Sequence, residues 1–511
     1  MPEFQRIHPV VRAGLLAVCL LTFATRILTL TADFPAGIDW SSDLYSDEGW
    51  YAGGAINQYL GGSWYVPGDL NTAINSPALQ VVDYGWFRLF GLSLVSIRSL
   101  TVVFTAFLIL LCFMITRKLS GEIPAWISAC LLSFNFFLFG YSKLAILEIP
   151  MVTLVLLAIW WVIRSYKSAL WQAAVLSLIY CLALLTKASA LFGLPVLLLA
   201  TWQRPGQLNA RIRYGLVFLG GVGLLYGGYI LWVLLNYPQD YLSYNLYSMA
   251  PRIEWSLNFF IYTAARVAWN GRVIDPVMYF LSILLVPCGL ILFRGFRRNS
   301  LVQLTILWLV VFSLELIPRG YLPPRYYLIY IVPVTILFSI LMSMGVKDLE
   351  LFFTGKIARL VDIAGAWWSG LSAQFRRLAP ALLITGIGLF NLGKMAAYLY
   401  APEYTYINAI TNIQQRIQAS GDTHPVLLGA SAQTMSIEIH IPTTNTQYGT
   451  QDLLWKLERY RPTFYVAVGP ESKVVDQISQ MYNLKLLATY DVFGNYYAGK
   501  PLYFYRLIPI K

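Results

Sequence analysis

Charged residues are scarce in this chain of 511 residues. Asp, Glu, Lys and Arg together make up only 12% of it, whereas 58% of the residues are hydrophobic and the mean hydropathy is +0.60. This composition excludes an ordinary soluble protein, in which about a quarter of the residues are charged. Apolar runs near the roughly 20 residues that span a bilayer recur along the chain. We therefore expect a polytopic α-helical membrane protein.

Cysteine and histidine are also rare, with five and three residues respectively. The cysteines all fall in apolar runs, and none lies in the long polar segments at 31–95 or 401–511. Their positions indicate no disulfide framework and no metal-ligand spacing. The histidines lie near the two ends of the chain, so we interpret them as surface or core residues and not as zinc ligands.

Acidic residues are outnumbered by basic ones, and the formal net charge is +12. A basic protein could bind nucleic acid, but here the basic residues follow a different pattern. Four short loops, at 117–122, 164–168, 203–213 and 294–300, hold ten basic residues against one acidic residue. Because positively charged loops stay in the cytoplasm, we interpret the excess charge as membrane topology and predict no nucleic-acid partner.

About eleven segments are expected to cross the membrane, and the first is expected to be a retained helix and not a cleaved signal peptide. If Arg6 and Arg12 hold the N-terminus in the cytoplasm, all four basic loops lie on that side too. The loop at 31–95 and the C-terminal tail then lie outside. This pattern predicts a multi-pass protein of the plasma (inner) membrane, with the tail in the periplasm or outside the cell. The expected spans are 10–30, 96–116, 123–140, 147–163, 169–185, 188–202, 214–236, 273–293, 301–317, 326–345 and 380–399.

The composition changes near residue 400, which predicts two domains. Residues 1–400 contain the spans and the external loop 31–95, whereas residues 401–511 have the composition of a soluble domain. In the tail, the sequence predicts helices at 404–419, 452–460 and 471–482 and strands at 425–430, 464–468, 485–492 and 502–508. This alternation indicates a C-terminal soluble α/β domain. At roughly 110 residues it is large enough to bury a core of its own.

The external loop 31–95 holds seven acidic residues and one basic residue. Two short surface helices are expected in it, at 47–59 and 77–90. Asp47 and Glu48 lie there side by side among aromatic residues, in the sequence Tyr-Ser-Asp-Glu-Gly-Trp-Tyr-Ala. Carboxylates kept at a membrane surface cost solvation energy, so they are more often retained for chemistry or ion binding than for stability. We expect this loop to carry a catalytic base.

Further ionisable residues fall at the external ends of the predicted spans. Acids and bases gathered on one side at bilayer depth suggest a cavity that accepts a charged headgroup. Each residue also has a structural interpretation, because Lys and Arg near helix ends can extend to the interface and Glu148 can stabilise the start of its helix. The residues are Lys143, Glu148, Lys187, Glu315, Arg319 and Arg325.

Metal binding is left open by the sequence. Asp47, Glu48 and Glu148 are the candidates for holding a divalent ion, since hard cations prefer carboxylate oxygens. The sequence identifies no other cofactor.

The motifs of the external loop resemble those of one family. The sequence Asp47-Glu48-Gly-Trp-Tyr-Ala, followed by Trp-Tyr-Val-Pro67 and Asn75-Ser-Pro77, is similar to the first external loop of the GT-C glycosyltransferases. It most resembles the protein O-mannosyltransferase and lipid A aminoarabinose transferase group. Many relatives have Lys-Pro-Pro where this chain has Asn75-Ser-Pro77, so one contact of the family is in doubt here.

Three later motifs follow in the order of that family. Ala-Ile-Leu-Glu148 resembles its second acidic motif, although Asp is common at the last position. Thr-Lys187-Ala resembles its Lys-Gly stretch, and Pro318-Arg-Gly-Tyr-Leu-Pro-Pro-Arg325 resembles its late external loop. The resemblance covers most of residues 1–400 and none of the tail.

The resemblance implies a transferase that moves a hexosyl or pentosyl group from a polyprenyl-phosphate carrier to an acceptor on the external face. The partners would be the lipid-linked sugar, membrane lipids and an unidentified acceptor, which is a protein, a lipid or a glycan. Asp47, or alternatively Glu48, would be the base, and Glu148 would hold the acceptor, a metal ion or a cation of the phosphate site. Residues implied in binding the donor phosphate are Lys187, Arg325, Arg319 and Lys143.

Two other functions are compatible with many spans. A lipid or sugar transporter (flippase) should show internal repeats and buried polar groups on both sides of the bilayer, whereas here no repeat is seen and the charges cluster externally. A noncatalytic component of a glycan-assembly complex would not turn over when purified alone. For the tail, acceptor selection and simple stabilisation both remain open.

Overall fold

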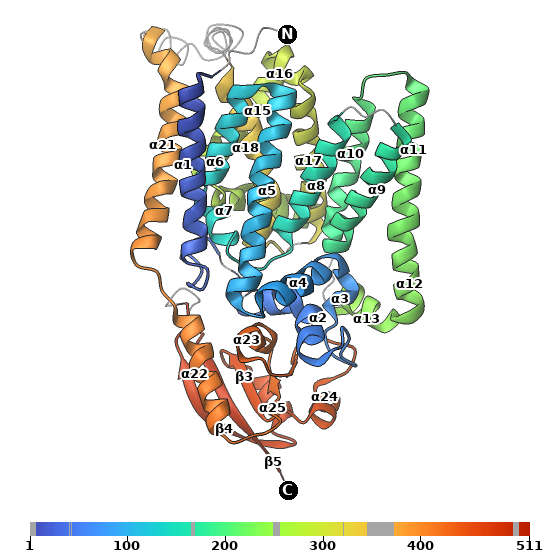
Figure 1. The fold of residues 1–511 in the computed structure, drawn as a ribbon, viewed down its shortest axis with the longest axis vertical. Helices are drawn as coiled ribbons and strands as arrows, with labels where there is room; N and C mark the ends of the chain where they lie inside the picture. The colour runs from blue at the N-terminus through green and yellow to red at the C-terminus, as the bar shows by residue number, and fades with distance from the viewer. Residues whose placement is uncertain are drawn as a thin grey trace.

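The computed structural model describes residues 7–39, 41, 43–164, 169–248, 256–319, 321–344, 373–493 and 500–510. Figure 1 shows a bundle of long helices stacked on a smaller region of strands and helices. The short helices α2, α3 and α4 lie between the two regions, roughly across the axes of the long helices (Figure 1). The segment 31–95, which the sequence predicts to be external and which we continue to call the external loop, therefore lies between the bundle and the C-terminal region.

Seven helical stretches in the described residues are long and apolar enough to cross a membrane. They are α1 (Pro9–Leu28), α5 (Leu94–Ser120), α9 (Ala169–Thr186), α11 and α12 (Leu208–Val222 and Gly228–Asn236), α17 (Ser300–Leu316), α18 (Leu328–Ser343), and α21 with α22 (Ala373–Tyr400 and Thr405–Ala419). Four shorter apolar helices accompany them: α6 (Glu122–Phe134), α8 (Glu148–Ile163), α10 (Gly193–Trp202) and α15 (Pro276–Leu292). A multi-pass helical architecture is thus confirmed, whereas the number of spans stays a prediction.

Helix α5 shows how local sequence sets the helix ends. Its N-cap Ser93 accepts a hydrogen bond from the backbone N–H of Ser96 at 3.1 Å. Arg117 and Lys118 lie in its last turn, where positive charge interacts favourably with the helix dipole. The helix ends at Gly121, whose φ of 105° suits glycine. Most of the expected basic loop 117–122 therefore belongs to helices and not to a connecting segment.

The external loop forms three short helices, α2 (Asp47–Gly61), α3 (Thr72–Asn75) and α4 (Pro77–Phe90). The two expected surface helices correspond to α2 and α4. Gln80 of α4 is fully buried and joins all three helices. Its Oε1 accepts from the N–H of Ala55 at 2.8 Å, and its Nε2 donates to the carbonyl of Tyr51 and to Thr72 Oγ1. The loop is thus a packed unit and not a flexible connection.

The C-terminal region contains a five-stranded sheet in the order β2-β1-β3-β5-β4. Strand β1 runs parallel to β2 and β3, whereas β5 runs antiparallel to β3 and β4. The strands are β1 (Leu427–Leu428), β2 (Thr443–Thr444), β3 (Phe464–Val468), β4 (Tyr482–Tyr490) and β5 (Leu502–Pro509), and the helices after α22 are α23 (Ala432–Ile439), α24 (Leu453–Tyr460) and α25 (Ser472–Ile478). Helix α23 faces α2 of the external loop (Figure 1).

The remaining elements are short segments between the long helices. The membrane part also contains α7 (Phe136–Tyr141), η2 (Ala188–Phe192), η3 (Gly223–Gly227), α13 (Pro238–Leu242), η4 (Ser243–Ser248), α14 (Leu257–Asn270), η5 (Gly271–Val273), α16 (Arg294–Arg298), η6 (Ile317–Arg319) and η7 (Pro324–Tyr327), and η1 (Asp43–Tyr45) precedes α2.

Candidate active site

The Asp47-Glu48 pair occupies the first turn of α2, where the helix dipole favours negative charge. Both residues are buried, with 5% and 1% of their surface exposed. Because they are consecutive on a helix, their side chains leave it in different directions. Asp47 meets Arg325, and Glu48 meets Arg98. The structure therefore gives the two carboxylates different surroundings.

Glu48 is held on both oxygens. Its Oε2 accepts from Arg98 Nη2 at 2.6 Å, and its Oε1 accepts from Arg98 Nε at 2.8 Å and from the N–H of Ala145 at 3.0 Å. Arg98 also donates to the carbonyl of Leu30 at 2.6 Å. Such bidentate Arg–carboxylate pairs are strong and geometrically specific. Glu48 thus joins α2 to α5 and to the segment that precedes α8.

Arg98 was not predicted from the sequence to belong to the site, although its position in an apolar stretch indicates a buried partner. It is a lone charge early in the long apolar stretch that follows the acidic loop. A cation at that depth needs a buried partner, and the nearby acidic loop is the obvious source of one. Applied to Arg98, the same reasoning would have predicted its pair with a loop carboxylate.

Asp47 belongs to a row of four charged side chains, which we call the charged row: Asp47, Arg325, Glu148 and Lys187. Arg325 Nη1 lies 3.0 Å from Asp47 Oδ2, and Arg325 Nε lies 3.4 Å from Glu148 Oε1. Lys187 Nζ donates to the same Glu148 oxygen. Negative and positive groups therefore alternate, and Glu148 sits between the two cations.

Four separate parts of the chain supply the charged row. Asp47 begins α2, and Glu148 begins α8. Lys187 precedes η2 at the turn between α9 and α10, and Arg325 lies in η7 just before α18. Glu148 is completely buried, whereas the Lys187 side chain keeps 15% of its surface exposed. The row is thus a tertiary arrangement that opens to solvent at its lysine end.

Aromatic rings line the lysine end of the charged row. Lys187 Nζ lies 4.9 Å from the centre of the Tyr326 ring and 5.8 Å from that of Tyr51. These are distances at which a cation is attracted by a ring face. Tyr51 lies one helical turn after Asp47 on α2, so the same helix supplies a carboxylate of the charged row and an aromatic ring beside Lys187.

The surroundings shift the pKa values of Asp47 and Lys187. Burial raises the pKa of Asp47 well above its usual value, the negative charge of Glu148 raises it further, and Lys187 opposes the shift. Burial by itself lowers the pKa of Lys187, but Glu148, Tyr326 and Tyr244 together raise it, so the net shift is upward. Lys187 therefore stays cationic, while the Asp47 carboxylate binds a proton more readily than an exposed aspartate.

The structure does not bring Lys143 to the charged row. Its Nζ donates to Thr29 Oγ1 at 3.1 Å and to the Tyr398 hydroxyl at 2.7 Å, and it lies 3.9 Å from the centre of the Tyr398 ring. Burial, together with the positive charges of Arg98 and Arg26, lowers the pKa of Lys143 to about 6. It acts here as a donor that ties α21 to the end of α1.

Arg319 also makes its contact elsewhere. Its Nη2 lies 3.0 Å from Glu315 Oε1, one helical turn earlier, and about a third of its side chain is exposed. The structure therefore joins four of the seven predicted site residues. Glu48, Lys143 and Arg319 each have other partners.

The C-terminal region directly supports the turn that carries Asp47. Thr434 Oγ1 accepts from the N–H of Gly49 at 3.0 Å and donates to the carbonyl of Ser46 at 3.0 Å, so it bridges the first turn of α2. Trp50 Nε1 donates to the carbonyl of Ala430 at 2.7 Å. A Cβ atom on Gly49 would lie 2.0 Å from the Thr434 nitrogen, which explains the glycine.

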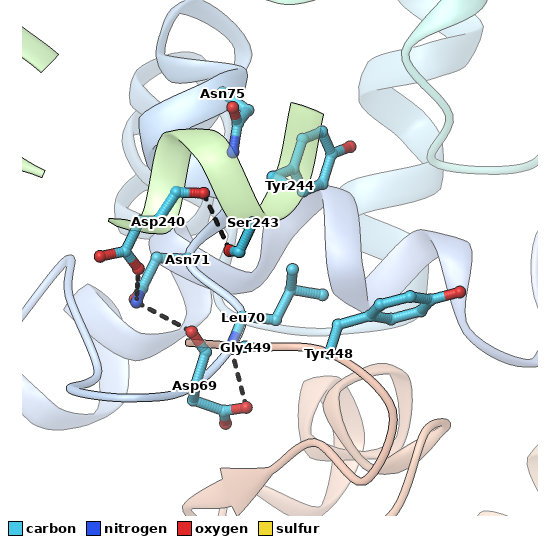
Figure 2. Close-up of a pocket in the computed structure, with 9 residues that line it drawn as sticks. All are labelled: Asp69, Leu70, Asn71, Asn75, Asp240, Ser243, Tyr244, Tyr448 and Gly449. Carbon is cyan, nitrogen blue, oxygen red and sulfur yellow. Dashed lines mark hydrogen bonds between the residues drawn. The ribbon is translucent and has the colours of Figure 1, made fainter. Parts of the chain in front are cut away.

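A small polar pocket lies where the external loop, α13 and η4, and the C-terminal region meet. Figure 2 shows Asp69, Asn71 and Asp240 on one side of it and Tyr244 and Tyr448 on the other. Asn71 Nδ2 donates to Asp240 Oδ1 at 2.9 Å and to the carbonyl of Asp69 at 3.0 Å. Tyr244 lies close enough to the charged row for Lys187 and Asp47 to influence its pKa.

A second junction lies beside that pocket. Asp69 is buried, and its Oδ1 lies 3.0 Å from Lys456 Nζ of α24. Lys456 also donates to the backbone carbonyl of Asn445 at 2.9 Å, and Asn445 in turn donates its N–H to Asp69. The ion pair between Asp69 and Lys456 is buried, and both side chains also form hydrogen bonds to Asn445. It therefore fixes the position of the external loop relative to the C-terminal region.

The carboxylates do not form a metal-binding set. Asp47 and Glu148 face Arg325 and Lys187, and Glu48 faces Arg98. In the part of the chain that the structure describes, no group of three or more His, Cys, Asp or Glu side chains surrounds one point. The residues present do not fit a carboxylate-bound divalent ion, and the proposal below uses none.

Comparison with known sequences relates the chain to a family model and to a curated relative. A family model described as dolichyl-phosphate-mannose-protein mannosyltransferase matches residues 77–226. The undecaprenyl phosphate-alpha-4-amino-4-deoxy-L-arabinose arabinosyl transferase 2 of Pseudomonas fluorescens is 27% identical over 330 residues, which are 59% of this chain and 52% of the relative. The chain thus spans about half the length of this curated relative.

Solved structures match over nearly the whole chain. ArnT from Cupriavidus metallidurans, bound to undecaprenyl phosphate, superposes with a TM-score of 0.62 at 14% identity and covers 98% of both chains. The archaeal oligosaccharyltransferase AglB from Archaeoglobus fulgidus, in complex with an inhibitory peptide and a dolichol-phosphate, gives 0.51 at 11% identity over 97% of this chain and 74% of that one. The chain therefore has the GT-C fold of ArnT, and its resemblance to the polyprenyl-phosphate-sugar-dependent transferases of that fold is confirmed.

Proposed function

We propose that the protein is a membrane glycosyltransferase that moves a sugar from a polyprenyl-phosphate carrier to an acceptor at the external face of the plasma (inner) membrane. The charged row carries this proposal. It combines a buried carboxylate beside one cation, Asp47 with Arg325, and a second cation, Lys187, on the far side of Glu148. Such a set can remove a proton from one substrate and stabilise the phosphate released from another. The match to ArnT, solved with undecaprenyl phosphate, supports the donor class.

Asp47 is the proposed base. It accepts the proton of the acceptor hydroxyl while that oxygen forms a bond to the anomeric carbon of the donor sugar. The bond between the anomeric carbon and the phosphate oxygen breaks at the same carbon, and its electron pair leaves with the polyprenyl phosphate. The raised pKa of Asp47 supports this role, because a base must bind the proton that it removes.

Glu48 is assigned a structural role. Its two oxygens already accept three hydrogen bonds, two from Arg98 and one from Ala145. Removing Glu48 from these partners would leave a buried guanidinium without its countercharge. This difference in contacts supports Asp47 over Glu48 as the base.

Arg325 and Lys187 are the proposed phosphate ligands. A guanidinium and an ammonium on opposite sides of Glu148 can share the charge that develops on the leaving phosphate. Of the three roles left open for Glu148, its contacts support the third, because it touches both cations. We infer that Glu148 positions the two cations before the donor arrives.

We infer that residues 401–511 form an external domain and that the N-terminus is cytoplasmic. The basic loop residues Arg294, Arg297 and Arg298 lie in α16, on the side of the bundle far from the sheet (Figure 1). Positive charge on that side is typical of the cytoplasmic face. The contacts of Thr434 and Lys456 with the external loop support a role of this domain in shaping the acceptor side of the site.

Mass spectrometry of envelope lipids, glycans and glycoproteins tests the proposal. Cells that contain the wild-type protein should have one sugar-bearing envelope species that cells with Asp47→Asn lack, and the variant cells should accumulate the lipid-linked sugar. If the two profiles were identical while both proteins reached the membrane, the proposed transfer would be wrong.

A further inference from the structure

Tyrosine side chains from several parts of the chain lie around the charged row. The ring centres of Tyr51 and Tyr326 are 5.8 and 4.9 Å from Lys187 Nζ. Further tyrosines come from separate segments: Tyr244 of η4, Tyr321 between η6 and η7, and Tyr448 between β2 and α24. The C-terminal region therefore supplies one ring of an aromatic surface whose other members belong to the membrane part.

Tyr448 reaches the Asp47 end of the charged row through Trp50. Trp50 follows Asp47 by three positions on α2, so the two side chains are neighbours on the helix. The ring of Tyr448 packs edge-to-face against that of Trp50, with 5.1 Å between the ring centres. Burial raises the pKa of Tyr448, and the negative charge of Asp47 raises it further. The ring contact and the charge effect both place Tyr448 at this end.

Tyr321 approaches the same end from the late external loop. It lies four positions before Arg325, the residue that contacts Asp47. Burial raises the pKa of Tyr321, and the nearby Asp47 and Tyr448 raise it further. The ring lies edge-on to that of Tyr326, with 6.2 Å between the centres, and 47% of the residue is exposed. Part of Tyr321 is therefore open to solvent beside the proposed base.

The backbone of Tyr448 is fixed, whereas its hydroxyl is available. Its N–H donates to Asn445 Oδ1 at 3.1 Å, and its carbonyl accepts from Lys456, the partner of Asp69. Within the described residues its hydroxyl forms no hydrogen bond. Figure 2 shows the ring extending away from Asp69 and Asn71. A half-buried ring that is held through its backbone, with an unbound polar tip, is preorganised to contact a ligand.

The chemistry of Tyr321 and Tyr448 indicates the class of that ligand. Each side chain has a flat apolar face and a hydroxyl at its tip. A sugar ring has the complementary pattern, with C–H groups on its faces and hydroxyls around its edge. An acyl chain would shield the Tyr448 hydroxyl from water without replacing its hydrogen bonds, and an extended peptide is held largely through its backbone. The two tyrosines therefore match a saccharide.

We propose that Tyr321 and Tyr448 form the acceptor subsite and that the acceptor is a saccharide, with one sugar ring stacked on the tyrosines and its reacting hydroxyl directed at Asp47. The choice of this end as the acceptor side rests on the proposed function. Because Tyr321 is open to solvent, the subsite accommodates a sugar at the end of a larger glycan. The donor sugar has the same chemistry, but its phosphate is placed at Lys187, beside Tyr326.

Saturation-transfer NMR on the purified full-length protein in detergent micelles tests binding without the reaction. The probes are the methyl pyranosides of glucose, galactose, mannose and N-acetylglucosamine. We expect the wild type to bind at least one of them and Tyr448→Leu to bind it about fivefold more weakly, the usual effect of losing one aromatic contact. Tyr448→Phe, which keeps the ring, should retain most of the affinity. Tyr400→Leu, at a tyrosine of α21 that is 92% exposed, is the matched control and should change nothing.

The alternatives to this subsite give different results in the same experiment. No binding by the wild type, or equal binding by Tyr448→Leu, would overturn the subsite. Loss of binding in Tyr326→Leu but not in Tyr448→Leu would overturn it too, because the sugar would then lie at the phosphate end, in the position of the donor sugar. Asp47→Asn should bind the pyranoside as the wild type does, so failure of the transfer reaction leaves this test intact.

Transfer assays test the acceptor class. Proteoliposomes that contain the lipid-linked sugar receive an envelope extract that has been digested with protease or oxidised with periodate, which cleaves the vicinal diols of sugars. We expect transfer to the digested extract and none to the oxidised extract. Tyr448→Leu should raise the acceptor KM by about fivefold, with little change in kcat or in affinity for undecaprenyl phosphate. The reverse pattern of the two extracts would overturn the saccharide assignment, whereas no transfer to an untreated extract would contradict the proposed function itself.

Discussion

Asp47 and Glu48 are neighbours on α2, but their carboxylates have different contacts. Asp47 has one guanidinium beside it and a raised pKa, whereas Glu48 is bound on both oxygens by Arg98 and the backbone. A base must accept a proton during the reaction, and a carboxylate that balances a buried guanidinium can do so only by leaving that cation unpaired. The division of roles within the pair therefore follows from their contacts.

Substitution of each carboxylate should separate these roles. Asp47→Asn should lower turnover by about 10²- to 10⁴-fold, the usual contribution of a general base, with a small change in unfolding temperature. Glu48→Gln should instead destabilise the protein, because removing one charge of a buried pair costs about 3–5 kcal/mol. Turnover and thermal unfolding of both purified variants provide the check. A stable Glu48→Gln protein with no turnover would reverse the assignment.

The two lysines of the predicted site offer a matched comparison. Lys187→Met should weaken binding of the polyprenyl-phosphate donor, because it removes a group that stays cationic beside the phosphate position. Lys143→Met should leave donor affinity unchanged, since Lys143 contacts Thr29 and Tyr398 and its pKa is lowered to about 6. Equilibrium binding of undecaprenyl phosphate measures both. Equal losses in the two variants would contradict the phosphate site.

The raised pKa of Asp47 has a consequence for the dependence of turnover on pH. A base works only when deprotonated, so raising its pKa moves the acidic limb of the profile to higher pH than an ordinary aspartate gives. Lys187 lowers the pKa of Asp47, and therefore Lys187→Met should move that limb higher still. The pH profiles of kcat/KM for the wild type and the variant test the direction of this shift. A limb that moves to lower pH would show that another group titrates.

At the scale of elements, helix α2 is held by hydrogen bonds from two other helices, α4 and α23. Gln80 of α4 holds its later turns, and Thr434 of α23 bridges its first turn between Ser46 and Gly49. The position of Asp47 thus depends on an element about 390 residues away in the chain. The C-terminal region thus contributes to the site by positioning the turn that carries Asp47.

Loss of the Thr434 hydroxyl should disturb the first turn of α2. Thr434→Val leaves the Gly49 N–H without its acceptor, at a cost of about 1–3 kcal/mol, and Thr434→Ser keeps the hydroxyl. We expect the valine variant to have a lower kcat and a shifted acidic limb in its pH profile, and the serine variant to behave like the wild type. A valine variant that is less stable but has an unchanged kcat and pH profile would limit Thr434 to a structural role.

Elements with strong local signals were predictable from the sequence. Helices α2 and α4 follow from a pair of acids at one helix start and Pro77 at the other. Strand β3 follows from a continuous apolar run, and β5 follows from an apolar and aromatic run that only Arg506 interrupts. Helix α23 and strand β2 were missed because they are defined by packing against α2 and β1 and not by periodicity.

Part of the candidate site was predictable, because its residues lie on the same side of the membrane in the predicted topology. The acidic pair of the loop 31–95 identified Asp47, and residues of both signs near the predicted external helix ends identified the other three members of the charged row. Which ones would meet could not be predicted, because the contacts depend on how α8, η2 and η7 pack in three dimensions. Lys143 has the same sequence signature as Lys187, yet it ends beside Tyr398 of α21.

On the scale of the whole molecule, the two ends of the helical bundle carry different kinds of charged residue. Basic residues of α16 lie at one end of the bundle, and the charged row and the C-terminal region lie at the other (Figure 1). In the orientation that we propose, the chemistry takes place at the outer surface of the bilayer, where a lipid-linked sugar can meet an acceptor.

Labelling of single cysteines tests that orientation. On a background without the five native cysteines, Lys473→Cys in α25 should react with a membrane-impermeant maleimide in intact cells or spheroplasts, because we place the C-terminal region outside. Arg297→Cys in α16 should react only after permeabilisation. The opposite pattern would invert the topology and place the charged row on the cytoplasmic side.

Turnover by the purified protein tests the central claim most directly. The lipid-linked sugar that accumulates in Asp47→Asn cells would be incorporated into proteoliposomes with an envelope extract as the source of acceptor, and release of free polyprenyl phosphate would be measured. The wild type should release polyprenyl phosphate and form a sugar-bearing product, and Asp47→Asn should do neither. Equal release by the two proteins, or none by the wild type, would contradict transfer from a polyprenyl-phosphate carrier with Asp47 as base.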